Sequence, residues 1–290
     1  DPLIYLAVAS VLNVILDVLL VCVARLGVAG VALGTMIAQA VSAYLVMRQL
    51  IRTREAYRVE LKKIRFHRDM IRQILMVGLP AALQQSITAF SNVVVQSYIN
   101  SFGTAAIAGY STTIRIDGFL QLVLQSFNMT ITTFVGQNIG AGRYDRMKKA
   151  IRVSLVISIL CVWFLCAVIL VFFEPLMHIF TDDPQAIAFG REMMGFLFPA
   201  VWLYSFVDVF SGAIRGAGQA VPVTVISALT ICVFRIIWLE VLLHIVNDIR
   251  VVFLCYPVSW ILCGSALTWY YFRRSTLRRS IQANAALEAK

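Results

Sequence analysis

Residues 153–173 read VSLVISILCVWFLCAVILVFF, a run of 21 residues that contains no charged side chain. Such a run predicts a helix that crosses a membrane, because about 20 helical residues span a hydrocarbon core of about 30 Å. A helix is expected because lipid offers the backbone no hydrogen-bond partners, and a helix pairs its own polar groups internally.

Similar apolar stretches recur along the chain. Of its 290 residues, 60% are hydrophobic and only 14% are charged, a composition that excludes a soluble globular protein. We therefore predict an all-α membrane protein with eight transmembrane helices. The predicted spans are Leu3–Ala24, Ala29–Arg48, Ile71–Ile99, Ala105–Val135, Val153–Phe173, Met193–Ile214, Ala220–Val246 and Val251–Phe272.

Basic residues mark one side of the membrane. Twenty of the 25 Lys and Arg residues lie beyond alternate ends of the spans, whereas Arg25, Arg191 and Arg250 lie at the opposite ends. Because cytoplasmic loops carry an excess of Lys and Arg, this pattern predicts a multi-pass cell-membrane protein with both chain ends in the cytoplasm. The net charge of +10 then lies at the membrane surface, where it attracts anionic lipid headgroups, and no nucleic-acid partner is expected.

The basic cytoplasmic connector 51–70 divides the chain into two predicted parts. Residues 1–50 are predicted to form a two-helix hairpin, residues 71–274 a six-helix block and residues 275–290 a basic cytoplasmic tail. The chain opens on Asp1, without an initiator Met, directly before an apolar run, which favours a fragment whose upstream part is missing. Since transporters are often built from repeated bundles, we interpret the hairpin as the end of one six-helix lobe and the block as the other lobe.

Asp17 is the strongest functional candidate, because a charged group at the centre of a membrane helix costs about 2.5–3.5 kcal/mol. Asn13 precedes it by one helical turn on the same face, and Thr35 falls at a similar depth on the next helix. Carboxylate, amide and hydroxyl can thus converge on one site, where Asp17 would carry a proton or bind Na⁺. The alternative is that Asn13 satisfies Asp17 in a purely structural contact.

Later spans hold candidates for a cavity or substrate site. Gln84, Gln85 and Thr88 belong to an unusually polar helix, which is predicted to line a wet cavity because amides are costly to expose to lipid. Interhelical hydrogen bonding is the alternative. The remaining candidates are three ionisable residues, Arg115, Asp117 and Asp208. For these residues, a structural hydrogen-bond network or solvation at a helix end is the alternative.

The sequence lacks the motifs of ATP binding and of hydrolytic catalysis. It has no GxxxxGK[ST] loop for ATP phosphates and no GxSxG nucleophile turn. His67, His178 and His244 are isolated and offer no metal spacing, and the six cysteines, which form no CxxC pair, are interpreted as packing residues. We expect neither an enzyme nor a cofactor, and no metal beyond Na⁺ at Asp17.

Glycine-rich motifs carry a family resemblance. The run Val135-Gly-Gln-Asn-Ile-Gly-Ala-Gly-Arg143, followed by a basic helix start, resembles the multidrug and toxic compound extrusion (MATE) family. Further similar motifs occur in the family's order, namely Leu12-Asn-Val-Ile-Leu-Asp17, Gly78-Leu-Pro-Ala-Ala-Leu-Gln-Gln85 and Arg215-Gly-Ala-Gly-Gln-Ala-Val-Pro222. The resemblance extends to Phe272 and aligns the chain with the family's helices five to twelve.

The resemblance implies part of a twelve-helix transporter with two six-helix lobes and a V-shaped central cavity. Family members export drugs, often organic cations, in exchange for H⁺ or Na⁺. Asn13, Asp17 and Thr35 match the family's cation site in the N-terminal lobe, although relatives complete that site with an Asp on helix one, which this chain lacks. A second cation site, which some relatives have in the C-terminal lobe, is not expected, because residues 71–99 offer no carboxylate and Asp208 is displaced by one turn.

These features together predict a cation-coupled antiporter that exports drugs or toxic organic cations across the cytoplasmic membrane. Drug-like small molecules and membrane lipids are its expected partners, and the full-length protein is expected to be monomeric. The alternative is a flippase of similar architecture for lipid-linked oligosaccharides or lipids. A flippase for diphosphate headgroups would favour a more cationic cavity than Arg115 and Arg235 provide.

Overall fold

The computed structural model describes residues 2–54, 58–61 and 65–275, and these residues form helices and no strand. The prediction of an all-α protein is therefore confirmed. The chain divides into two compact units, residues 1–68 and 69–290. Residues 55–57 and 62–64 of the predicted connector lie outside the described residues, and so does the predicted tail beyond Ser275.

The first unit is a helical hairpin. α1 (Pro2–Asp17) continues into the π-helical turn η1 (Val18–Val23), and α2 (Gly27–Arg52) packs against both. The chain reverses at Gly27, whose φ of 54° lies in the left-handed region that glycine adopts without strain. The two helices pack closely because α2 presents small residues: a Cβ at Gly30 would lie 3.0 Å from the carbonyl oxygen of Leu20.

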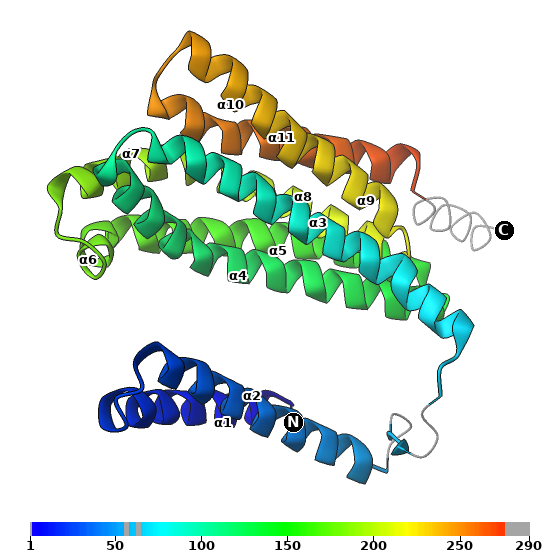
Figure 1. The fold of residues 1–290 in the computed structure, drawn as a ribbon. Coiled ribbons are helices and arrows are strands. Elements are labelled where there is room, and N and C mark those ends of the chain that lie inside the picture. Colours follow the sequence, from blue (N-terminus) through cyan, green and yellow to red (C-terminus); the bar gives the residue numbers. More distant parts are fainter. Residues whose placement is uncertain (1, 55–57, 62–64, 276–290) are drawn as a thin grey trace. The chain divides into compact units, whose positions relative to one another are not determined.

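The second unit is a bundle of long helices that run roughly along a common direction (Figure 1). α4 packs against α5, α7 and α8, and α11 packs against α7, α8 and α10. Hydrogen bonds join α3 to the bundle: Ser91 Oγ donates to the Ile231 carbonyl oxygen at 3.2 Å, and Thr224 Oγ1 donates to that of Pro80 at 2.8 Å. The elements are α3 (Arg68–Asn100), α4 (Thr104–Gly140), α5 (Tyr144–Val171), α6 (Phe173–His178), α7 (Pro184–Leu197), η3 (Val201–Leu203), α8 (Tyr204–Gly216), α9 (Ala220–Ser227), η4 (Ala228–Val233), α10 (Phe234–Ile245) and α11 (Ile249–Arg273).

Among the described residues, six helical segments are long and apolar enough to cross a membrane. They are Ile4–Val23, Gly27–Arg52, Arg68–Asn100, Tyr144–Val171, Ala220–Ile245 and Ile249–Arg273. α7 and the segment Val201–Gly216 make a seventh if they form one span. α4 has 37 residues but is not among the six, and it carries Arg115, Asp117 and many amide and hydroxyl side chains.

The structure does not contain the predicted span Met193–Ile214 as one continuous helix. Its helix begins earlier, at Pro184, and the path is bent by 47° between α7 and the segment Val201–Gly216. Pro199 lies in this break, where it cannot donate a backbone hydrogen bond and therefore cannot continue a regular helix.

The surface of α5 suits contact with lipid. Val162 is 1% exposed and faces the bundle, whereas the neighbouring Trp163 is 57% and Phe164 is 69% exposed. Large apolar side chains in such numbers on one helix surface would be unfavourable in water. The helix therefore has a bundle face and a lipid face, as a membrane-spanning helix at the edge of a bundle should.

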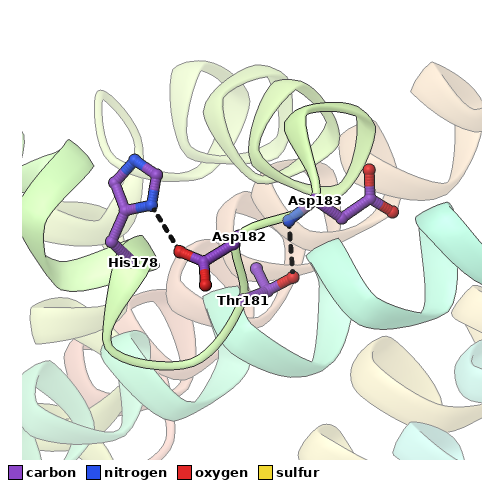
Figure 2. Close-up of polar contacts among 4 residues, drawn as sticks. All are labelled: His178, Thr181, Asp182 and Asp183. Carbon is purple, nitrogen blue, oxygen red and sulfur yellow. Dashed lines mark hydrogen bonds and ion pairs between the residues drawn. The ribbon is translucent and has the colours of Figure 1, made fainter.

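A short polar turn joins α6 to α7 (Figure 2). His178 Nδ1 lies 3.1 Å from the Asp182 carboxylate, and the Asp183 amide donates to Thr181 Oγ1 at 3.2 Å. The Asp183 carboxylate accepts a hydrogen bond from the Gln185 amide at 2.9 Å and so caps the start of α7. These turn residues lie in the connection that the sequence predicts between the fifth and sixth spans.

α8 and α4 approach so closely that only glycine fits at two positions of α8. A Cβ at Gly212 would lie 2.7 Å from the Asn128 carbonyl oxygen, and one at Gly216 would lie 2.5 Å from the Thr132 carbonyl oxygen. Thr132 Oγ1 donates to the Gly212 carbonyl oxygen at 3.1 Å across the same contact. Small residues spaced four apart allow this kind of backbone approach between membrane helices.

We expect Gly212→Ala to destabilise the purified protein by about 1–3 kcal/mol, because the added methyl group forces α8 away from α4. Thermal unfolding followed by intrinsic fluorescence in detergent measures the effect. Gly195→Ala on α7 is the matched control, since its Cβ would meet no atom within 4 Å. An unchanged melting temperature for both variants would contradict the close α4–α8 contact.

Candidate functional site: a polar cavity and a hairpin cluster

A cavity of about 1070 Å³ opens within the second unit. Side chains of α3, α4, α8, α10 and α11 contribute to its lining, which combines amides and charges with aromatic rings. The polar and aromatic lining residues include Gln84, Gln85, Thr88, Asn92, Gln96, Tyr110, Asp117, Gln121, Asn128, Tyr204, Asp208, Ser211, Arg215, Arg235, Tyr256 and Trp260.

Helical periodicity explains how these residues reach one cavity. The lining residues of α4 lie at positions 110, 114, 117, 118, 121, 122, 125 and 128, and those of α8 at 204, 207, 208, 211 and 215. Intervals of three and four residues place side chains on one helix face. Each of the two helices therefore turns a single polar stripe toward the cavity.

A hydrogen-bonded network occupies the contact between α4, α8 and α3. Asn128 Nδ2 donates to the Asp208 carboxylate at 3.2 Å and to Ser211 Oγ at 2.8 Å. Arg215 Nη2 donates to Gln84 Oε1 at 2.7 Å, and its Nη1 lies 3.5 Å from Asn128 Oδ1. Arg215 Nε is buried without a partner in the described part of the chain. One amide thus connects a carboxylate and a guanidinium that form no direct ion pair.

Asp117 is buried, with 7% of its surface exposed, and is only half satisfied. Its Oδ2 accepts a hydrogen bond from Gln121 Nε2 at 3.0 Å. Its Oδ1 is buried and has no hydrogen-bond partner among the described residues. A carboxylate oxygen without a donor is costly in a low-dielectric interior, so the charged form of Asp117 is only partly satisfied in this structure.

An aromatic group borders the same cavity. The hydroxyls of Tyr110 and Tyr256 are 2.8 Å apart, and the edges of the Tyr204 and Tyr256 rings each contact Trp260. The Arg235 guanidinium lies 4.3 Å from the centre of the Tyr256 ring. Flat apolar faces therefore adjoin charged groups in the cavity, an arrangement suited to organic ions.

The structure brings most of the predicted cavity candidates together. Gln84, Gln85, Thr88, Asp117 and Asp208 all line the cavity. Thr88 Oγ1 also donates to the Gln84 carbonyl oxygen at 2.9 Å within α3, and Gln84 Nε2 donates to Ser227 Oγ at 3.0 Å. Gln84 therefore both lines the cavity and bonds to another helix.

Arg115 is the exception among the predicted cavity residues. It is exposed and does not line the cavity; its guanidinium lies 5.6 Å from the centre of the Phe180 ring. The reason is helical geometry, because Arg115 and Asp117 are two residues apart and so point to different sides of α4. Arg115 therefore does not belong to this cavity, and its predicted role stays a prediction.

Sequence reasoning missed Arg215 as a cavity residue. The charge pattern grouped it with the basic residues at the membrane surface, yet its side chain lines the cavity. The signal was its spacing, since Asp208, Ser211 and Arg215 follow one another at intervals of three and four on α8.

The hairpin of the first unit holds a second polar cluster. Asn13 Nδ2 donates to Asp17 Oδ1 at 3.4 Å and lies 3.5 Å from Thr35 Oγ1, which itself donates to the Val31 carbonyl oxygen at 3.0 Å. The Asp17 carboxylate is held against α2, because a Cβ at Gly34 would lie 2.5 Å from its Oδ1. The three side chains predicted to converge are thus neighbours, and Asp17 is half-buried between the helices.

Comparison with known proteins identifies the family. The MatE family model matches residues 80–239, which is more than half of the chain, and the chain therefore belongs to the MatE family. The predicted resemblance is confirmed. Members of this family are multi-pass membrane transporters and not enzymes.

Two relatives illustrate the similarity in sequence. The chain is 27% identical to the Bacillus subtilis (strain 168) protein "Probable multidrug resistance protein YpnP" over 81% of this chain and 52% of the relative. It is 25% identical to "Multidrug export protein MepA" of Staphylococcus haemolyticus (strain JCSC1435) over 74% of this chain and 48% of the relative. The chain thus matches about half the length of these relatives.

Solved structures share the fold. A structure described as "Outward-facing conformation of a multidrug resistance MATE family transporter of the MOP superfamily" superposes with a TM-score of 0.87 at 19% identity, covering 95% of this chain and 62% of that one. A Pyrococcus furiosus Vc1 (DSM3638) transporter of the MOP superfamily gives 0.85 at 19% identity, with 93% and 62% covered. The chain therefore has the fold of part of a MATE transporter.

We expect Asn128→Leu to destabilise the protein by about 1–3 kcal/mol, because it leaves the Asp208 carboxylate and the Arg215 guanidinium without their shared partner. Thermal unfolding in detergent measures the loss. The control is Ser126→Ala on the same helix, whose exposed hydroxyl bonds, within the described ranges, only the Leu122 carbonyl oxygen of its own turn. Equal melting temperatures for the two variants would show that the network contributes no stability.

Proposed function

We propose that this chain is part of a cation-coupled antiporter that exports drugs or toxic organic cations across the cytoplasmic membrane. Membership of the MatE family and relatives named for multidrug export support this function. The observation that carries it is a polar and aromatic cavity that contains an incompletely paired carboxylate, Asp117. The same relatives favour drug export over the flippase alternative.

The cavity is suited in size and chemistry to drug-like molecules. Its volume of about 1070 Å³ lies at the upper end of the usual range of ligand pockets, about 300–1,000 Å³. Asp117 and Asp208 provide negative charge for an organic cation, and Tyr110, Tyr256 and Trp260 provide flat surfaces for its rings. Several amides around these groups supply donors and acceptors, so ligands of different shapes can be bound.

The hairpin cluster is proposed to couple export to an ion gradient. Asp17 supplies a carboxylate and Thr35 a hydroxyl oxygen, which are ligands that a small hard cation accepts, while Asn13 donates its Nδ2 to Asp17 and lies beside Thr35. Uptake of H⁺ or Na⁺ at Asp17 would drive transport only if the ion binds one conformation of the transporter more tightly than the other. Coupling therefore requires that the Asp17 site differ between the two conformations.

The proposed whole protein has twelve transmembrane helices in two lobes, eight of them in this chain. The chain spans about half the length of the two relatives described above, and 62% of the two solved structures. In the proposed topology the hairpin ends the first lobe and α3 to α11 form the second. In the same proposal both ends of the chain lie in the cytoplasm, which the distribution of basic residues supports. The complete transporter is proposed to act as a monomer.

Asp17→Asn should abolish energised export, because an amide neither takes up a proton nor carries the charge that attracts Na⁺. The measurement is ethidium accumulation in cells that express the complete reading frame in a host without its own major efflux pumps. Asp145→Asn, at an exposed position in the first turn of α5, is the matched control and should export normally. Normal export by the Asp17 variant would remove this residue from the mechanism.

Asp117→Asn should weaken binding of a cationic dye by about tenfold, equivalent to 1.4 kcal/mol, since it removes the negative charge that Asp117 contributes to the cavity lining. Fluorescence polarisation with purified protein measures the affinity. Asp182→Asn makes the same chemical change in the exposed turn before α7 and should leave the affinity unchanged. If both variants bind the dye as the native protein does, Asp117 is not part of the substrate site.

A further inference from the structure

Arg235 is a buried cation whose described partners are all neutral. Only 3% of its surface is exposed. Its Nε donates to Ser259 Oγ at 3.0 Å, its Nη1 donates to Asn92 Oδ1 at 3.4 Å, and its guanidinium lies against the Tyr256 ring. Ser259 Oγ in turn donates to the Tyr256 carbonyl oxygen at 2.8 Å, so this hydroxyl is fixed as an acceptor toward Arg235.

Arg235 lacks a counterion within the described part of the chain. The ion pairs there involve other residues, and none brings a carboxylate to this guanidinium. Arg215 differs, because a carboxylate, that of Asp208, hydrogen-bonds to the same Asn128 that Arg215 contacts. A charge at this depth in a membrane protein is costly unless it is paired or hydrogen-bonded. Two neutral acceptors and one ring offset only part of that cost.

The guanidinium has a free donor group beside the cavity. Nε and Nη1 make the two hydrogen bonds of this side chain, and Nη2 makes none to the described residues. Nη2 is not fully enclosed by the described protein atoms, and Arg235 lines the cavity. The unused N–H groups are therefore accessible to a ligand in the cavity, next to the aromatic side chains of Tyr256 and Trp260.

We propose that Arg235 binds an oxyanion of the transported molecule, specifically a carboxylate attached to an aromatic body. A guanidinium forms strong charge-assisted hydrogen bonds with carboxylates, and the adjoining rings would stack on an aromatic ligand. This inference rests on the proposed function and assigns a residue to the acidic group of a zwitterionic substrate. Asp117 and Arg235 would then bind the positive and negative groups of one molecule in the same cavity.

Two dyes that differ in one group test the proposal. A rhodamine as its ethyl ester is a cation, and the same rhodamine as its free acid is a zwitterion. Arg235→Met should weaken binding of the free acid to the purified transporter by about tenfold or more, while changing binding of the ester less than about threefold. Benzoate should compete with the free acid for the native protein and should not compete with the ester.

A purely structural role of Arg235 predicts a different result. Arg235 joins α10 to α3 through Asn92 and to α11 through Ser259, so loss of this connection would weaken both dyes equally. Asn92→Ala breaks one connection and keeps the charge; it should retain the difference between the dyes. Arg235→Lys keeps the positive charge but loses the planar guanidinium, so it should bind the free acid more tightly than Arg235→Met and less tightly than the native protein. This variant keeps the test valid if the Met variant is unstable.

The outcomes separate this inference from the proposed function. Binding of neither dye by the native protein would overturn both. Binding of the ester together with equal effects of Arg235→Met on the two dyes would overturn the carboxylate site alone. A lipid headgroup phosphate is the other source of an oxyanion: if Arg235→Met leaves binding of the free acid unchanged but lowers the amount of anionic lipid that the purified protein retains, the ligand is the headgroup and the substrate assignment is wrong.

Discussion

The contact between α4 and α8 is the constraint on which the cavity of the second unit depends. In lipid, apolar surfaces gain little by meeting one another, so helices associate through close packing and hydrogen bonds. Gly212 and Gly216 let the backbone of α8 approach that of α4 to a distance that a methyl group would prevent. The approach brings Asn128 to Asp208 and Ser211, and thereby turns the polar stripe of each helix toward the same space.

The buried polar groups of this cavity are satisfied unequally. Among the described residues, Asp208 accepts a hydrogen bond from Asn128, Asp117 has one oxygen with a donor and one without, and Arg235 contacts only neutral groups. Because an unpaired polar group in a low-dielectric interior is unfavourable, complete pairing would make the protein more stable. Incomplete pairing is expected where a transported molecule supplies the missing partner and then leaves.

A π-helical turn lies next to a functional candidate in each unit. η1 begins directly after Asp17, and η4 ends two residues before Arg235. A π-turn holds an extra residue in the helix and so changes the face on which the following side chains lie. In η4 this shift contributes to the inward direction of Arg235, while the exposed neighbours of the same helix, such as Ile237, point away from the bundle.

Sequence alone determined the helical class, because a backbone in lipid must form its hydrogen bonds internally. It also determined the family, because the residues of each motif are contiguous in the sequence. It also predicted that Asn13, Asp17 and Thr35 would be neighbours, since a short turn fixes the register of two adjacent helices. Tertiary structure decided the rest. Arg115 and Arg215 are both arginines in apolar helices, yet only Arg215 lines the cavity. Helical periodicity predicts which residues share a face, but the packing of other helices decides which face borders the cavity.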